Sequence, residues 1–184
     1  QHCAESHPSI GLVGPLTNKS SGMQMINEQP YNDIDELYQF GNKVSEINRR
    51  KYSPRNRISG FAMLITREVY ESVGELDERY ENGNFEDDDY CIRARKNGYK
   101  IMVAEDVYVH HFAGVSFNEN DMDYKKLYYK NEEVFEEKWS DIDIDNYEDK
   151  DEELLIDLED KLSEVSEEWD DEYYPEIFSD YFDD

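Results

Sequence analysis

The sequence predicts an α/β domain with a largely parallel or mixed sheet, followed by an acidic tail. Short apolar runs typical of strands alternate with amphipathic stretches that end at glycines, which is the order of a layered α/β domain. Charge then divides the chain, because residues 140–184 carry 21 acidic and two basic side chains, or −19 of the net −27, which leaves −8 for residues 1–139. We therefore expect a domain over 1–139 and a partly helical or disordered tail over 140–184.

The first part of the domain is expected to contain two strands and a helix. The apolar run IGLVG at 10–14 lies between prolines and predicts a buried strand. Residues 31–50 are in part typical of a helix. Its apolar side chains on one side are Ile34, Leu37, Tyr38 and Phe40. The basic stretch 50–57 is predicted as a loop, and the continuous apolar stretch 58–66 is the strongest strand signal.

Glycines and a threonine mark the helices of the second part. Thr66 is placed to cap a helix over 67–73, which Gly74 ends. A second helix follows an Asn-Gly turn and ends before Gly98. Residues 99–111 predict two short strands around Glu105–Asp106. The amphipathic pattern of 122–139 predicts a last helix.

Composition excludes some functions. The negative charge argues against a nucleic-acid partner, because phosphates would be repelled. Cys3 and Cys91 have no metal-binding spacing and do not indicate a disulfide scaffold. No apolar run approaches the roughly 20 residues that span a bilayer. The chain starts at Gln1 and soon enters a strand, so we expect a fragment of a longer protein.

Four consecutive acids, Glu86 to Asp89, open the helix after the Asn-Gly turn. One or two acids would complement the helix dipole, but four exceed that need, and at least one should have a raised pKa. A raised pKa suits a general base, whereas a solvated helix start is the alternative interpretation. His110 and His111 end the next strand, and they are either a pair of metal ligands or include one histidine that is only a partly buried aromatic side chain.

The chain up to about Trp139 resembles a family 2 glycosyltransferase. The resemblance lies in three ordered blocks. They are GLVGPLTNKSSGMQ at 11–24, the stretch from ISGFAMLIT to HHFAGVSF at 58–117, and KNEEVFEEKW at 130–139. It implies a Rossmann-like domain of the A-type glycosyltransferase fold. The implied activity is transfer of a hexose from a nucleotide-sugar donor to an acceptor hydroxyl, with inversion.

The resemblance also implies roles for particular residues. Asp87 matches the catalytic base and Glu86 the acceptor contact beside it. Asp88 and Asp89 match positions that cap and shape the turn. Acceptor-binding residues are further expected in the SGF segment: Ser59, Gly60 and Phe61. One of the two histidines, His110 or His111, is expected to complete a metal site, and the sequence does not choose between them.

The family's nucleotide-binding half and its Asp-x-Asp metal motif are expected upstream of Gln1. We therefore expect Mg²⁺ or Mn²⁺ as cofactor, held mainly by residues outside this chain, and an inactive chain when it is isolated. The expected partners are a nucleotide-sugar and a glycan or other hydroxyl acceptor. Loss of the neighbouring strands predicts self-association. The resemblance implies a cytoplasmic location, with any membrane association made through partners.

Two other classes remain open for the tail. Asp141, Asp143, Asp145 and Glu152 have the spacing of calcium ligands in an EF-hand loop, although Asn146 replaces the usual glycine. Beyond it, a heptad pattern from Leu155 to Trp169 is only two heptads long and is interpreted as a single amphipathic helix that docks on its own domain or frays in solvent. The mixed acids and aromatics from Trp169 to Phe182 are typical of a segment that folds on a partner or docks on the basic stretch 49–57.

Overall fold

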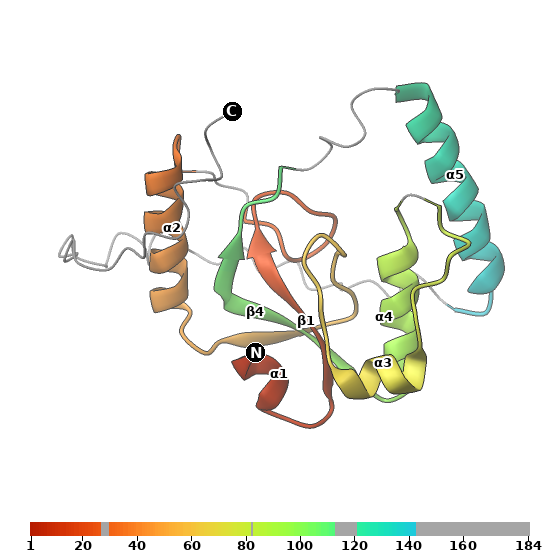
Figure 1. The fold of residues 1–184 in the computed structure, drawn as a ribbon, viewed down its shortest axis with the longest axis horizontal. Coiled ribbons are helices and arrows are strands. Elements are labelled where there is room, and N and C mark those ends of the chain that lie inside the picture. The colour runs from red at the N-terminus through yellow and green to blue at the C-terminus, as the bar shows by residue number, and fades with distance from the viewer. Residues whose placement is uncertain (27–29, 82, 113–120, 143–184) are drawn as a thin grey trace.

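A four-stranded mixed sheet lies at the centre of the protein, in the order β2-β4-β1-β3 (Figure 1). The parallel central pair consists of β1 (Ile10–Thr17) and β4 (Lys100–Val109). The edge strands β2 (Tyr52–Arg55) and β3 (Leu64–Ile65) are antiparallel to their neighbours. This computed structural model describes residues 1–26, 30–81, 83–112 and 121–142. The α/β class and the mixed sheet are confirmed.

Helices cover both faces of the sheet. On one face, Leu12 and Val103 share a core with side chains of three helices. These are α2 (Ile34–Ile47), α3 (Arg67–Val73) and α4 (Glu86–Lys96). On the other face, Val13 and Ala104 pack with Cys3 of the short α1 (His2–Glu5). The alternation of neighbouring residues between the two cores follows from the two-residue period of a strand.

The last described helix, α5 (Asp121–Lys138), packs outside α4 (Figure 1). Phe135 and Trp139 form a separate apolar cluster with Ile92 of α4 and with Tyr80. The predicted amphipathic helix is therefore confirmed. Among the described residues, no helix has the length and apolar character needed to cross a bilayer.

The predicted helix boundaries are confirmed where capping residues signalled them. The Thr66 side chain accepts a hydrogen bond from the Val69 backbone N–H at the start of α3. Gly74 and Gly98 follow α3 and α4 with φ of +86° and +85°, a conformation that glycine adopts without a Cβ clash. For α2 the predicted face is partly wrong: Phe40 is buried, but Ile34 and Tyr38 are 38% and 40% exposed.

Three strand predictions are wrong. The stretch 50–57 contains β2 rather than a loop, and its Pro54 is tolerated because β2 is an edge strand. Residues 100–109 form one strand rather than two, because the backbone N–H of Glu105 donates to Lys51 and pairing with β1 resumes at Tyr108 and Val109 beyond the shift in register. Only Leu64–Ile65 of the stretch 58–66 is a strand.

Residues 58–60 are not a strand because side chains occupy their backbone donors. The N–H of Ile58 contacts Sγ of Cys91 at 3.5 Å, and the N–H of Ser59 donates to Oε1 of Gln24 at 2.6 Å. The N–H of Gly60 donates to Oδ2 of Asp87 at 2.6 Å. This segment therefore runs onto the start of α4 instead of joining the sheet.

Candidate functional site

A cleft of about 750 Å³ lies between residues 57–61, the start of α4 and one face of α5. Six of the seven predicted site residues line it: Ser59, Gly60, Phe61, Glu86, Asp87 and His111. The seventh, His110, is not among the lining residues. The structure therefore brings together residues that are up to 52 positions apart in the sequence.

The Asp87 carboxylate is fixed in the cleft by two backbone donors. Its Oδ2 accepts from Gly60, and its Oδ1 accepts from the N–H of Asp88 at 2.9 Å. A Cβ at position 60 would lie 3.2 Å from the Cβ of Asp87, so the glycine allows this close approach. We expected Gly60 to bring backbone close to a ligand, and the structure shows it close to the proposed base. Each oxygen keeps a further lone pair for a substrate hydroxyl.

The neighbouring carboxyl of Glu86 is less well satisfied. Its Oε2 is buried, and this atom has no hydrogen-bond partner among the described residues. Burial raises the pKa of Glu86, and the charges of Asp87 and Asp88 raise it further. The expectation that one acid of the run has a raised pKa is confirmed, for Glu86. A carboxyl group donates a hydrogen bond to a polar ligand when it is protonated and accepts one in either protonation state.

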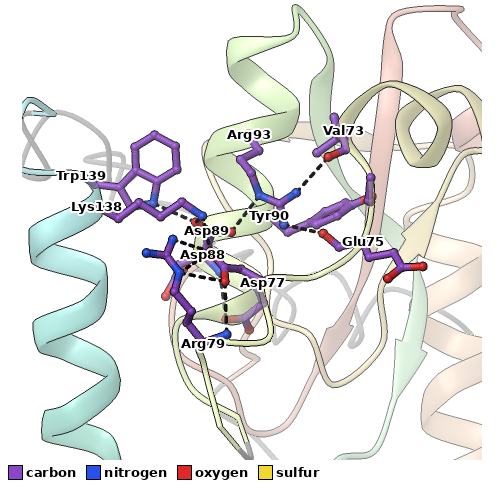
Figure 2. Close-up of polar contacts among 12 residues, drawn as sticks. Val73, Glu75, Asp77, Arg79, Asp88, Asp89, Tyr90, Arg93, Lys138 and Trp139 are labelled. Atoms are coloured by element: carbon purple, nitrogen blue, oxygen red, sulfur yellow. Dashed lines mark hydrogen bonds and ion pairs between the residues drawn. The ribbon is translucent and has the colours of Figure 1, made fainter.

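The remaining two acids of the run are bound by cations. Asp88 forms an ion pair with Arg57 at 2.7 Å. Asp89 is fully buried, where its Oδ2 accepts from Arg93 and its Oδ1 contacts Lys138 at 2.5 Å (Figure 2). We expected both residues to cap and shape the turn. Instead, the structure pairs each with a basic side chain, and these pairs anchor the helix start.

The turn before α4 has an unusual backbone that α5 holds in place. Gly83, Asn84 and Phe85 all have positive φ, of 96°, 71° and 72°, and such values are strained for a bulky residue such as phenylalanine. Nδ2 of the fully buried Asn131 lies within hydrogen-bond distance of three carbonyl oxygens of this region, those of Glu81, Gly83 and Asn84. The turn that presents the acidic run is therefore held by a residue 47 positions beyond Asn84.

The two histidines differ in their surroundings. His110 Nδ1 is 2.6 Å from the Tyr31 hydroxyl, and burial together with His111 lowers the pKa of His110. The His111 ring is stacked on Phe61 at 4.8 Å. Its Nδ1 lies 2.8 Å from the Lys19 carbonyl oxygen, which can only accept a hydrogen bond. His111 therefore donates through Nδ1 and presents an unprotonated Nε2 in its neutral form.

This arrangement fits a metal ligand, because ligating histidines usually donate their other ring nitrogen to a carbonyl or carboxylate. Within the described ranges, however, the chain contains no cluster of three or more His, Cys, Asp or Glu side chains suited to a metal ion. His111 thus supplies at most part of a metal site. The metal-binding roles of His110 and His111 stay predictions.

Several residues of the site are missing from the sequence-based prediction. They are Arg57, Asn131 and the α5 residues that line the cleft, namely Tyr124, Tyr128, Glu132, Phe135 and Glu136. The amphipathic pattern of α5 was visible, but it indicated packing rather than a wall of the site. A spacing of four residues between Tyr124, Tyr128, Glu132 and Glu136 was the available signal.

The proposed calcium spacing and the heptad pattern lie largely outside the described residues, which end at Ile142. The division at 139–140 into domain and tail also stays a prediction. The exposed Asp141 is the first residue of the calcium spacing and the one ligand position within the described part.

No family model matches the chain, and no solved structure matches it. Similar proteins are uncharacterized protein Mb1552 of Mycobacterium bovis and uncharacterized protein Rv1525 of Mycobacterium tuberculosis. Each is 28% identical over 112 residues, which cover 59% of this chain and 38% of the relative. The chain thus matches well under half the length of these relatives. The resemblance to family 2 glycosyltransferases stays a prediction.

Proposed function

We propose that this chain is the acceptor-side part of an inverting glycosyltransferase with an A-type, Rossmann-like domain, and that its cleft binds the hydroxyl acceptor. One observation carries the proposal: the Asp87 carboxylate is oriented by two backbone N–H groups inside the cleft where the other predicted acceptor residues gather. The mixed α/β fold and the position of Asp87 at a helix start beside the sheet agree with it.

In this proposal Asp87 is the general base. The acceptor hydroxyl transfers its proton to a carboxylate oxygen of Asp87 while its own oxygen forms a bond to the anomeric carbon of the donor sugar. The bond from that carbon to the diphosphate oxygen breaks and the diphosphate leaves with the electron pair. Because attack comes from the opposite face, the configuration inverts. Glu86 and the Ser59–Phe61 segment position the acceptor.

A divalent cation, Mg²⁺ or Mn²⁺, supplies charge stabilisation for the departing diphosphate. In this chain Nε2 of His111 fits one ligand position, since the Lys19 carbonyl fixes its tautomer. His110 fits less well, because it lies 2.6 Å from Tyr31 and does not line the cleft. The other ligands and the nucleotide-binding strands are proposed to lie outside this chain.

The test is Asp87→Asn in the whole protein that contains this chain, assayed for release of nucleoside diphosphate from a panel of nucleotide-sugars. Loss of a general base should slow transfer by about 10²–10⁴-fold while donor binding is kept. Glu71→Gln, which changes an exposed acid of α3, is the matched control and should keep full activity. Wild-type turnover by Asp87→Asn would refute the assignment.

The proposed division of the active site has a separate test. Uridine, guanosine and thymidine diphosphates are titrated with Mn²⁺ into this 184-residue chain in a calorimeter. We expect no saturable heat, because hard cations bound by one or two carboxylates depend on substrate phosphates, and the strands that hold those phosphates are proposed to be elsewhere. Micromolar binding of any of the three would place the nucleotide site within this chain.

A further inference from the structure

The wall of the cleft formed by α5 is a single row of side chains. Tyr124, Tyr128, Glu132 and Glu136 follow one another at steps of four residues, and all four line the cleft. Side chains at this spacing lie on one face of a helix, one above the other. The row therefore presents two aromatic rings followed by two carboxylates to whatever occupies the cleft.

The side chains around the cleft are strongly unbalanced in charge. Five of the lining residues are acidic: Glu86, Asp87, Asp88, Glu132 and Glu136. Among the described lining residues Arg57 is the single Lys or Arg, and it already forms an ion pair with Asp88. Counting the Asp, Glu and Arg side chains alone, the formal charge of the lining is −4, and it stays negative, at −2, when Glu86 and His111 are both counted as protonated.

The chain does not neutralise the two carboxylates of the α5 row. Neither Glu132 nor Glu136 makes an ion pair or a hydrogen bond with another described residue. Lysines are close in sequence, but Lys130 pairs with Glu81, and Lys138 pairs with Asp77 and with the buried Asp89. These lysines are therefore engaged away from the cleft, and its acidic wall is left for an external cation.

We infer that the hydroxyl acceptor carries a protonated amine, as an amino sugar does, and that Glu132 and Glu136 bind this amine while Tyr124 and Tyr128 pack against the sugar ring. The inference rests on the proposed function, because it names the substrate class of the same cleft. A protonated amine is attracted both by carboxylates and by the faces of aromatic rings. An acceptor with a carboxylate or phosphate would be repelled by the same lining.

The test compares three sugars with the same pyranose ring in the full chain at pH 6, without any nucleotide-sugar. Glucosamine carries a charged amine, N-acetylglucosamine has the same nitrogen without charge, and glucuronate carries a carboxylate. We expect glucosamine to bind at least tenfold more tightly than N-acetylglucosamine in an NMR titration. Glucuronate should show no saturable binding, and the preference for glucosamine should weaken as salt screens the charges.

Two double variants distinguish the effect of the cleft carboxylates on glucosamine binding from the effect of the protein's overall negative charge. Glu132→Gln with Glu136→Gln should reduce the preference to less than twofold. Glu133→Gln with Glu137→Gln removes the same charge from exposed positions of the same helix, and it should leave the preference unchanged. If both double variants lose the preference equally, or if the three sugars bind alike or not at all, the inference is overturned.

Failure of this inference can be told apart from failure of the proposed function. The binding assay involves no donor and no transfer, whereas the Asp87→Asn assay measures transfer alone. If Asp87→Asn abolishes transfer but glucosamine has no preference, the amine inference falls and the proposed function stands. If the preference is found but no transfer is detected with any nucleotide-sugar, the cleft binds amino sugars and the transferase proposal falls.

Discussion

The first turn of α4 has two sides, and neighbouring acids of the same chemistry face opposite environments on them. On the cleft side, within the part of the chain that the structure describes, Asp87 is held by backbone N–H groups alone and Oε2 of Glu86 has no hydrogen-bond partner. On the core side, Asp89 is fully buried and contacts Arg93, Lys138 and the indole N–H of Trp139 (Figure 2). Asp87 and Asp89 are only two positions apart. Asp87 has lone pairs left to accept further hydrogen bonds, whereas the oxygens of Asp89 are bonded to side chains of the protein itself.

The comparison shows how a run of four carboxylates is tolerated. Asp88 is paired with Arg57 of the segment after β2, and Asp89 with Arg93 of α4 and Lys138 of α5, so the repulsion within the run is offset by ion pairs. Arg93 extends this anchoring by donating to the carbonyls of Val73 and Glu75, at the end of α3. The core side thus holds the helix start in a fixed position, and the cleft side can present less stabilised acids.

The largest expected effect is a loss of stability on removing the buried charge of Asp89. Asp89→Asn should lower the free energy of unfolding by about 3–5 kcal/mol, because it leaves Lys138 and Arg93 facing a neutral group in a buried position. The measurement is urea denaturation followed by circular dichroism. Asp87→Asn is the comparison variant and should cost less, about 1.5–3 kcal/mol, because asparagine keeps one acceptor oxygen and loses only one of the two hydrogen bonds from backbone N–H groups.

Equal losses from Asp89→Asn and Asp87→Asn would break the comparison, since the two sides would then not differ in their contribution to the fold. A large loss at Asp87 alone would move the anchoring role to the cleft side. Both variants keep the side-chain volume, so neither result would reflect a cavity.

The core side of this helix start was only partly predictable from the sequence. Capping threonine and helix-ending glycines act over a few residues, so Thr66, Gly74 and Gly98 were assigned correctly. The partners of Asp89 include Lys138 and Trp139, which are 49 and 50 positions away, and local patterns carry no information on such pairs. For the same reason, the hydrogen bonds from Asn131 to the turn at 83–85 could not be predicted from the sequence.

The segment 58–60 shows a second limit. Its apolar composition predicts a strand, and it would satisfy the usual pattern of one. The fold instead satisfies its backbone donors with Cys91, Gln24 and Asp87. That departure from the local pattern is what brings Gly60 to Asp87, the proposed base.

A smaller effect is expected on removing one neutral donor to Asp89. Trp139→Phe keeps an aromatic ring in the cluster with Tyr80 and Phe135 but loses the hydrogen bond from Nε1 to Asp89, which is 3.0 Å long. Hydrogen bonds to charged groups contribute roughly 1.5–3 kcal/mol, so the unfolding free energy should fall by about that amount. A loss as large as that of Asp89→Asn would mean that ring packing, rather than the bond, is what the substitution removes.

The smallest expected effect is on how the free energy of unfolding depends on pH. Asp77 and Glu86 should contribute to this dependence with opposite signs. Hydrogen bonds from Arg79, with help from Lys138, hold the pKa of Asp77 well below its usual range, so Asp77 stabilises the fold at neutral pH and this contribution is lost as acid protonates it. Glu86 is the reverse case, because burial raises its pKa above the ordinary value of 4.5. The folded state then binds the proton more tightly than the unfolded state does. Stability therefore falls as pH rises from the unfolded pKa to the folded pKa of Glu86, and the penalty remains at pH 7.

Glu86→Gln should for this reason raise the unfolding free energy at pH 7 and leave it unchanged near pH 3.5, where the wild-type carboxyl is protonated in both states. Asp77→Asn should instead lower the free energy of unfolding at pH 7. Its difference from wild type should become smaller as the pH falls below about 4. Urea denaturation at closely spaced pH values measures both differences, and each variant serves as the control for the other. If Glu86→Gln instead lowered stability at pH 7, the ionised carboxylate of Glu86 would be making a favourable interaction in the folded protein, and the cleft side would be anchored by charge as the core side is.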